Sequence, residues 1–135
     1  MAEMFFKDLV RKSGLENDFY IDSAATDRDE IGNSMHAGTR RVLEAHNIPY
    51  TDHRARLATK SDYENFDLLV IMDGENERHL KRIIGEDSKN KVRYLMSFSG
   101  KKRDVADPWY TGNFDETWRD ISEGCRALLK YLQKK

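Results

Sequence analysis

The sequence predicts an α/β fold, a three-layer α/β/α arrangement in which a short parallel sheet lies between helices. Amphipathic helical segments alternate with short apolar runs in the order α-β-α-α-β-α-β-α, which is typical of a parallel sheet. One apolar run, residues 67–73, is continuous and bounded by acids, as expected for a strand buried on both faces. No repeat, low-complexity linker or internal boundary is visible, so residues 1–135 are predicted to form one domain.

The first half of the chain is predicted to contain a helix, a strand and a second helix. Apolar residues recur at helical spacing over residues 1–15, and Gly14 stands where a helix commonly ends. Residues 19–23, which begin with two aromatic residues and an isoleucine, are predicted to form a short strand. Helical spacing returns over residues 36–48, and this helix is expected to end near Asn47.

The middle of the chain is predicted to continue the alternation. Ser61 with Glu64 three residues later matches a capping box, which predicts a short helix at this point. The buried strand at 67–73 is then followed by a helix over residues 75–85. Residues 91–98 are predicted to form the third strand.

A long final helix is predicted over residues 114–133. Its apolar stripe consists of Trp118, Ile121, Cys125, Leu128 and Leu132. The position of Cys125 in mid-helix on this stripe predicts a core residue rather than a reactive thiol, because no glycine-rich loop surrounds it. The arginine that follows it points about 100° away around the helix, so the two side chains do not face one common group.

The composition excludes several classes of protein. The chain has 23 basic and 24 acidic residues, a balance that does not favour nucleic acid as a partner. No apolar run approaches the roughly 20 residues of a membrane helix, and no signal peptide is visible. A single cysteine cannot form an internal disulfide, which favours a reducing cytoplasm. The four histidines lack metal-binding spacing with one another and with Cys125, so a zinc site is not expected. No other cofactor is expected either.

One loop stands out for chemistry. The stretch "DVADPWYTGNF", residues 104–114, places an acid before a proline and two large aromatic residues. Together with "YIDSAATDRDEIGN", "HRARLATKSDYENFDLLVIMD" and "EGCRALL", it resembles the low-molecular-weight protein-tyrosine phosphatases. The resemblance extends over essentially all 135 residues and keeps the order and spacing of these motifs.

The resemblance implies a role for each matching residue of the cleft. Asp107 matches the general acid, which must be protonated to donate a proton to the leaving phenolate. Trp109 and Tyr110 match paired aromatic residues that wall the cleft, and Glu30 lies in the loop that lines the substrate mouth. Beside it, Asp29 stands where many members have an aromatic residue, a change that adds negative charge near a dianionic substrate.

Four further residues match supporting positions. Ser23 and His53 match a pair that hydrogen-bonds the back of the family's catalytic loop, with simple structural roles at a strand end and a turn as the alternative. Asp73 and Asn76 match an acid and an amide near the cleft, and the alternative for them is helix capping.

The chain resembles a family member truncated just after its catalytic loop. Members begin with a strand and a Cys-x-x-x-x-x-Arg-Ser-Pro loop, whose cysteine attacks phosphorus and whose arginine holds the phosphoryl oxygens. Sequence like Met1-Ala2-Glu3 directly follows that loop in the family. Without this cysteine and arginine, the chain as given is predicted to be inactive. A pseudophosphatase that binds a phosphoprotein or a small anion is the main alternative, and a gene product without present function is another.

Loss of a central strand is expected to destabilise the sheet. Three outcomes are open: the flanking strands pair directly, a second copy fills the gap in a homodimer, or the sequence belongs to a longer protein. The substrate class also stays open between phosphotyrosine, phosphoarginine and arsenate.

Overall fold

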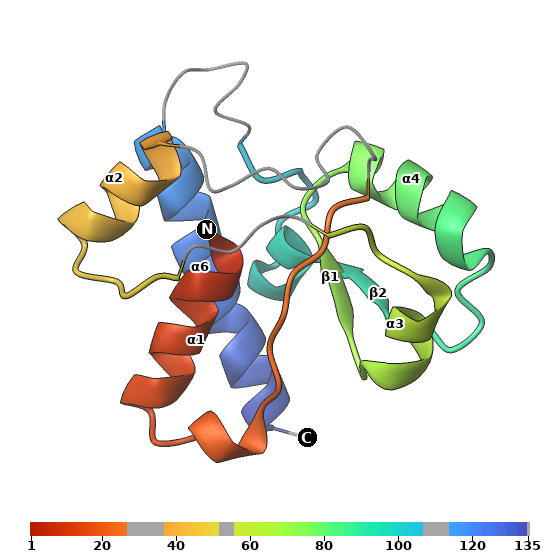
Figure 1. The fold of residues 1–135 in the computed structure, drawn as a ribbon, viewed down its shortest axis with the longest axis horizontal. Helices are drawn as coiled ribbons and strands as arrows, with labels where there is room; N and C mark the ends of the chain where they lie inside the picture. The colour runs from red at the N-terminus through yellow and green to blue at the C-terminus, as the bar shows by residue number, and fades with distance from the viewer. Residues whose placement is uncertain (27–36, 52–55, 107–113, 135) are drawn as a thin grey trace.

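The computed structural model describes residues 1–26, 37–51, 56–106 and 114–134, and all structural statements below concern these residues (Figure 1). The helices are α1 (Ala2–Lys12), α2 (Ala37–Ala45), α3 (Lys60–Asn65), α4 (Gly74–Ile84) and α6 (Phe114–Gln133). The strands are β1 (Leu69–Ile71) and β2 (Val92–Tyr94), and the 3₁₀ helices are η1 (Glu16–Asp18) and η3 (Leu95–Ser99).

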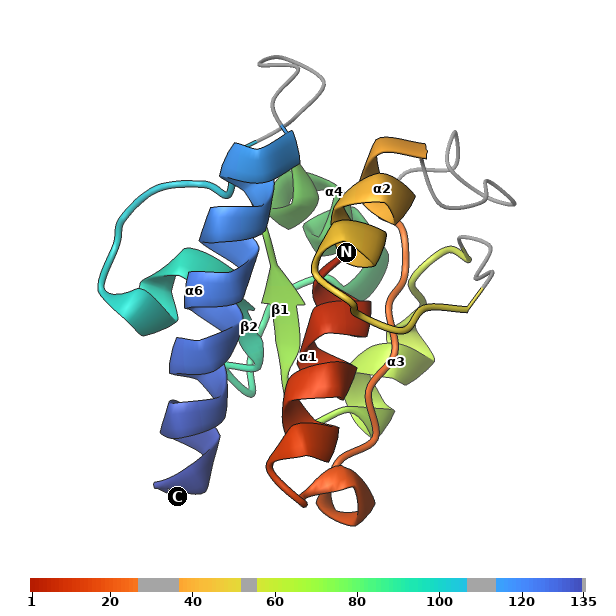
Figure 2. The same ribbon diagram turned by 90° about the vertical axis from the view of Figure 1, so that its left-hand side faces the viewer.

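The two strands form a parallel sheet, as the sequence predicts. Leu69 lies opposite Val92 and Ile71 opposite Tyr94 in the register. Helix α4 connects the strands, and Figures 1 and 2 show α1 and α6 on one side of the sheet with α3 and α4 on the other. The predicted three-layer α/β arrangement is therefore confirmed.

The strand predicted at residues 19–23 is wrong within the described residues. Residues 19–25, called here the extended segment, run beside the sheet without joining it (Figure 1). One isolated parallel bridge, between Ala25 and Leu57, is its ladder contact. Direct pairing of the two flanking strands, one of the three expected outcomes, is thus not what the described residues show. Consistent with the open edge, Leu69 and Val70 of β1 are only partly buried, and the predicted burial of both faces holds for Ile71 alone.

The main core lies between α1, α6 and η3. On α6 the predicted stripe is confirmed, because Ile121, Cys125 and Leu128 are buried and Trp118 and Leu132 pack against them. Figure 2 shows α1 and α6 side by side along the sheet. The Trp118 ring meets the Phe5 ring of α1 edge-on, with centroids 5.0 Å apart.

A close approach between α6 and η3 depends on one glycine. A Cβ atom at Gly124 would lie 2.6 Å from Cγ of Leu95, well inside van der Waals contact. Leu95 is itself 1% exposed, so it has no free space to move into. The glycine therefore sets how closely η3 packs on α6.

Helix ends follow the predicted signals with one correction. Gly14 and Gly85 have φ values of 72° and 77°, which suit residues just past a helix. The capping box of α3 is formed by Thr59 and Asp62, not by Ser61 and Glu64.

The third strand is shorter than predicted. Of residues 91–98, only Val92–Tyr94 pair, and η3 follows at once. The hydroxyl of Ser97 donates to the Tyr94 carbonyl oxygen at 2.6 Å, and the hydroxyl of Ser99 donates to that of Met96 at 2.9 Å. Such local side-chain bonds favour a turn over a sheet ladder.

Candidate active site at the carboxyl end of β1

The carboxyl end of β1 leads directly into the N-terminus of α4. Asp73 is the N-cap of α4, and its carboxylate accepts a hydrogen bond from the Asn76 amide at 2.7 Å. The Asn76 side-chain oxygen in turn accepts from the Met72 amide at 3.1 Å. The capping interpretation is therefore confirmed for Asp73, and both residues also lie at the end of the sheet where α/β proteins bind ligands.

The segment that precedes Asp107 is tied to the same strand end. The Val105 amide donates to the Met72 carbonyl oxygen at 2.9 Å, and the Val105 side chain is buried. Residues 103–106, called here the entry segment, thus lie beside the end of β1.

A cavity of about 570 Å³ opens at this point. Its lining residues are Asp73, Gly74, Glu75, Arg78, Asp104, Val105 and Ala106. Three of them are acids and one is an arginine, so the lining carries a net negative charge. Burial and a hydrogen bond with Glu77 raise the pKa of the nearby Tyr94 to about 12, which keeps its hydroxyl protonated at neutral pH.

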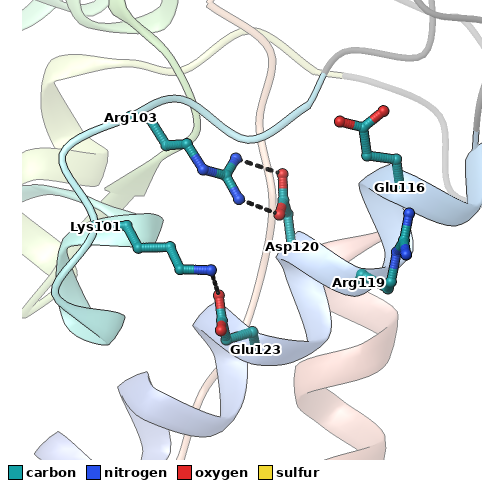
Figure 3. Close-up of a pocket in the computed structure, with 6 residues that line it drawn as sticks. All are labelled: Lys101, Arg103, Glu116, Arg119, Asp120 and Glu123. Carbon is teal, nitrogen blue, oxygen red and sulfur yellow. Dashed lines mark hydrogen bonds and ion pairs between the residues drawn. The ribbon is translucent and has the colours of Figure 1, made fainter.

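The entry segment is also bound to α6. Both terminal guanidinium nitrogens of Arg103 donate to the Asp120 carboxylate, at 2.8 and 2.6 Å (Figure 3). The Arg103 guanidinium is the main cause that lowers the pKa of Asp120 below its ordinary value, so this buried carboxyl stays ionised at neutral pH. A second cavity, of about 370 Å³, lies around this ion pair.

Ser23 lies on the extended segment next to α1. Its hydroxyl donates to the Glu3 carboxylate at 2.5 Å, and Glu3 also forms an ion pair with Lys7 at 2.6 Å. Glu3 is 9% exposed and belongs to the first turn of α1. The structure thus places Ser23 beside the start of α1.

Cys125 lies in the core, as the helical stripe predicts. It is 2% exposed, and its Sγ lies 4.0 Å from the Ala2 carbonyl oxygen. Burial raises the pKa of its thiol to about 12, so the thiolate is a negligible fraction at neutral pH. Cys125 is thus a buried core residue of α6.

The remaining predicted site residues lie outside the described residues. They are Glu30, His53, Asp107, Trp109 and Tyr110. Within the described parts of the chain, no group of three or more His, Cys, Asp or Glu side chains could hold a metal ion. No helix among the same residues is long and apolar enough to cross a membrane.

Two anchoring residues were missed by the sequence analysis. Arg56 bridges Asp22 and Asp62, with nitrogen–oxygen distances of 3.0 and 2.9 Å. Asp120 holds Arg103 from a position 17 residues along the chain. A signal existed for Asp120, because it stands next to the apolar stripe of α6, where a charged residue is unexpected without a partner.

Comparison with known proteins identifies relatives of the whole chain. A family model described as "Low molecular weight phosphotyrosine protein phosphatase" matches residues 1–135. The chain is 37% identical to the low molecular weight protein-tyrosine-phosphatase YfkJ of Bacillus subtilis, over 99% of this chain and 87% of the relative. It is 34% identical to a low molecular weight phosphotyrosine protein phosphatase of Gallus gallus, over 96% of this chain and 85% of the relative.

Solved structures of low molecular weight phosphatases and of an arginine phosphatase also superpose on this chain. The crystal structure of YfkJ superposes with a TM-score of 0.92 over 98% of this chain and 85% of that protein, at 36% identity. A Drosophila arginine phosphatase superposes with a TM-score of 0.83 over 97% of this chain and 87% of that protein, at 27% identity.

Proposed function

The chain belongs to the low molecular weight phosphotyrosine protein phosphatase family, and on that premise we propose that residues 1–135 carry the proton-donating part of a phosphomonoesterase site. The observation that carries the proposal is the hydrogen bond from the Val105 amide to the Met72 carbonyl oxygen, 2.9 Å long. It ties the residues before Asp107 to the strand end and to the acidic cavity. Neighbouring carboxylates favour the protonated form of an acid placed beside them, as a proton donor requires.

In the proposed reaction Asp107 donates its proton to the ester oxygen as the bond from phosphorus to that oxygen breaks. A thiolate forms the new bond to phosphorus in the family, and water later releases phosphate from it. Trp109 and Tyr110 wall the cleft, Glu30 lies at its mouth, and Ser23 and His53 support the loop that carries the nucleophile.

We further propose that the 135 residues by themselves do not hydrolyse phosphomonoesters. Their one cysteine is Cys125, whose thiol is buried and protonated. A general acid without a nucleophile and without donors for the phosphoryl oxygens lacks the two largest contributions to such catalysis. We also propose that residues 1–135 form one domain and that the protein works in the cytoplasm.

The test compares two proteins with p-nitrophenyl phosphate as substrate. The first is the 135-residue chain, which should give no turnover above a blank. The second, called the loop fusion, carries a strand and a Cys-x-x-x-x-x-Arg-Ser-Pro loop of the family pattern before Met1, and it should turn over. Asp107→Asn in the fusion should lower the rate by about 100-fold. Turnover by the chain alone, or a fusion insensitive to Asp107→Asn, contradicts the proposal.

The substrate class is tested with the same fusion. Phosphotyrosine and phosphoarginine are compared directly, because one structural relative is an arginine phosphatase and Asp29 adds a charge at the expected mouth. The ratio of kcat/KM values between the two substrates decides between them.

The second candidate function, a pseudophosphatase that binds an anion or a phosphoprotein, is less well supported. Glu3 places a carboxylate in the first turn of α1, where a bound anion would otherwise meet free amides. Titration of the 135-residue chain with phosphate should therefore give no saturable NMR shifts near Glu3. Saturable shifts there without turnover favour the binding function.

A further inference from the structure

The residue before Asp107 is held by α6 through both of its peptide groups. The Ala106 amide donates to the Asp120 carboxylate at 2.9 Å. The Ala106 carbonyl oxygen accepts from the Thr117 hydroxyl at 2.7 Å. Thr117 and Asp120 are three residues apart, so they lie on the same face of the helix.

Asp120 can accept the Ala106 hydrogen bond from a buried position because the charge of its carboxylate is balanced. Its carboxylate is buried, with the residue 6% exposed, and such a group is stable only with charged or hydrogen-bonded partners. Arg103 supplies a two-pronged ion pair at one end of the entry segment, and the Ala106 amide supplies a third donor at the other end. One carboxylate therefore spans the whole segment from residue 103 to residue 106.

The two residues before Asp107 are thus fixed by different parts of the fold. Val105 is bound to the end of β1, and Ala106 is bound to α6. The sheet and the helix therefore jointly fix the chain up to Ala106, the residue that precedes Asp107.

We propose that Asp120 is a positioning residue for the general acid Asp107, acting through the Ala106 peptide and Arg103. The inference rests on the proposed function, since it needs Asp107 to be the proton donor. Asp120 does not touch the substrate in this scheme. It holds the backbone from which the acid extends, and displacements of about 1 Å at a reacting group are enough to slow catalysis strongly.

A second ion pair between the same two parts of the molecule provides a matched control. Lys101 and Glu123 lie 2.9 Å apart, next to the Arg103–Asp120 pair (Figure 3). Their side chains are 43% and 45% exposed, whereas the Asp120 side chain is 8% exposed. No hydrogen bond between Glu123 and Ala106 is found among the described residues, so Glu123→Ala removes the same charge from the same helix without releasing the Ala106 peptide.

The first experiment measures amide hydrogen exchange by NMR in the 135-residue chain. Asp120→Ala should raise the exchange rate of the Ala106 amide on the order of tenfold or more, because a hydrogen bond to a charged acceptor is lost. Glu123→Ala should leave that rate within about twofold. Alanine favours helix at both positions, so α6 itself is preserved. Unchanged exchange of Ala106 in Asp120→Ala overturns the inference.

Thr117→Val gives an independent variant if Asp120→Ala fails to fold. It removes the hydroxyl that donates to the Ala106 carbonyl oxygen and keeps the volume of the side chain. Exchange should then rise at the amides that flank Ala106 and stay constant in β1. A rise spread evenly over all amides would show general destabilisation and would overturn the inference.

The second experiment uses the loop fusion to separate positioning from mere stability. A weaker proton donor matters more for a poor leaving group, so Asp120→Ala should slow phenyl phosphate hydrolysis at least about fivefold more than p-nitrophenyl phosphate hydrolysis. Glu123→Ala should slow both equally or not at all. An equal loss on both substrates in Asp120→Ala contradicts positioning of the acid.

The two proposals fail in different ways. If Asp107→Asn shows no dependence on the leaving group, the proposed function is wrong, whatever Asp120 does. If Asp107→Asn shows that dependence and Asp120→Ala does not, the function stands and the positioning role is wrong.

Discussion

The entry segment lies at the carboxyl end of β1, the extended segment runs along the sheet, and the two are held by different means. The entry segment has a backbone hydrogen bond to β1 and a buried carboxylate, Asp120, behind it. The extended segment has one bridge at Ala25, a hydrogen bond from Ser23 to Glu3, and an ion pair of Arg56 with Asp22, whose side chain is 24% exposed against 8% for Asp120. Tyr20 within it is 81% exposed.

The two segments differ in how far their charged contacts are shielded from water. A charged contact shielded from water is strong and specific, whereas the same contact at the surface is weakened by solvent and salt. We therefore expect the entry segment to be ordered with the core and the extended segment to open locally. Four changes test this comparison.

The largest effect is expected from Gly124→Val, which acts on the packing of η3 against α6. The new side chain would collide with Leu95 and push η3 away from α6. The free energy of unfolding should fall by about 3 kcal/mol or more, as measured by urea denaturation. Lys130→Val, on the exposed face of the same helix, controls for the β-branched side chain and should cost less than about 1 kcal/mol.

The next effect is expected from the Arg103–Asp120 pair and should depend on pH. Because the folded-state pKa of Asp120 is lowered, its contribution is complete above the ordinary carboxyl pKa, about 3.9, and is lost as the pH falls through the lower value. At pH 7, Asp120→Asn should reduce the free energy of unfolding by about 2 kcal/mol. The variant should also lose less stability than the parent between pH 5 and pH 2, and an identical acid profile for both proteins would contradict this account.

Features that depend on contacts between neighbouring residues could be predicted from the sequence, whereas features that depend on distant contacts could not. The bounds of α6 could be predicted because its apolar stripe is a local pattern, and the parallel sheet followed from the alternation of elements. The strand predicted at residues 19–23 was wrong, because a strand exists only with a partner and the hydrophobic pattern does not show whether one is present.

The same reasoning applies to the site. The capping role of Asp73 depends on a residue three positions away, and it was one of two predicted roles, the other being a position near the cleft. The anchors Asp120 and Arg56 act on residues 17 and 34 positions away, and no local rule pairs them. The family resemblance supplied Asp107 but not the residues that hold its neighbours.

A smaller effect is expected from Arg56→Gln, which releases the extended segment. The change breaks the ion pairs with Asp22 and Asp62, both partly exposed to solvent. Global stability should fall by less than about 1 kcal/mol, while the Ala25 amide exchanges faster in NMR experiments. High salt should have the same effect on the parent protein and none on the variant. Lys89→Gln, which breaks the exposed pair with Glu64, serves as the control and should leave Ala25 unchanged.

The smallest effect is expected from Tyr20→Ser on the extended segment. The Tyr20 ring lies 5.6 Å from the Phe66 ring at a tilt of 34°, but most of its surface faces water. Its removal should lower the free energy of unfolding by about 0.5 kcal/mol, and Tyr20→Phe, which keeps the ring, should cost nothing measurable. A loss above about 2 kcal/mol would mean that the extended segment supports the fold as strongly as the entry segment does, which would remove the contrast between them.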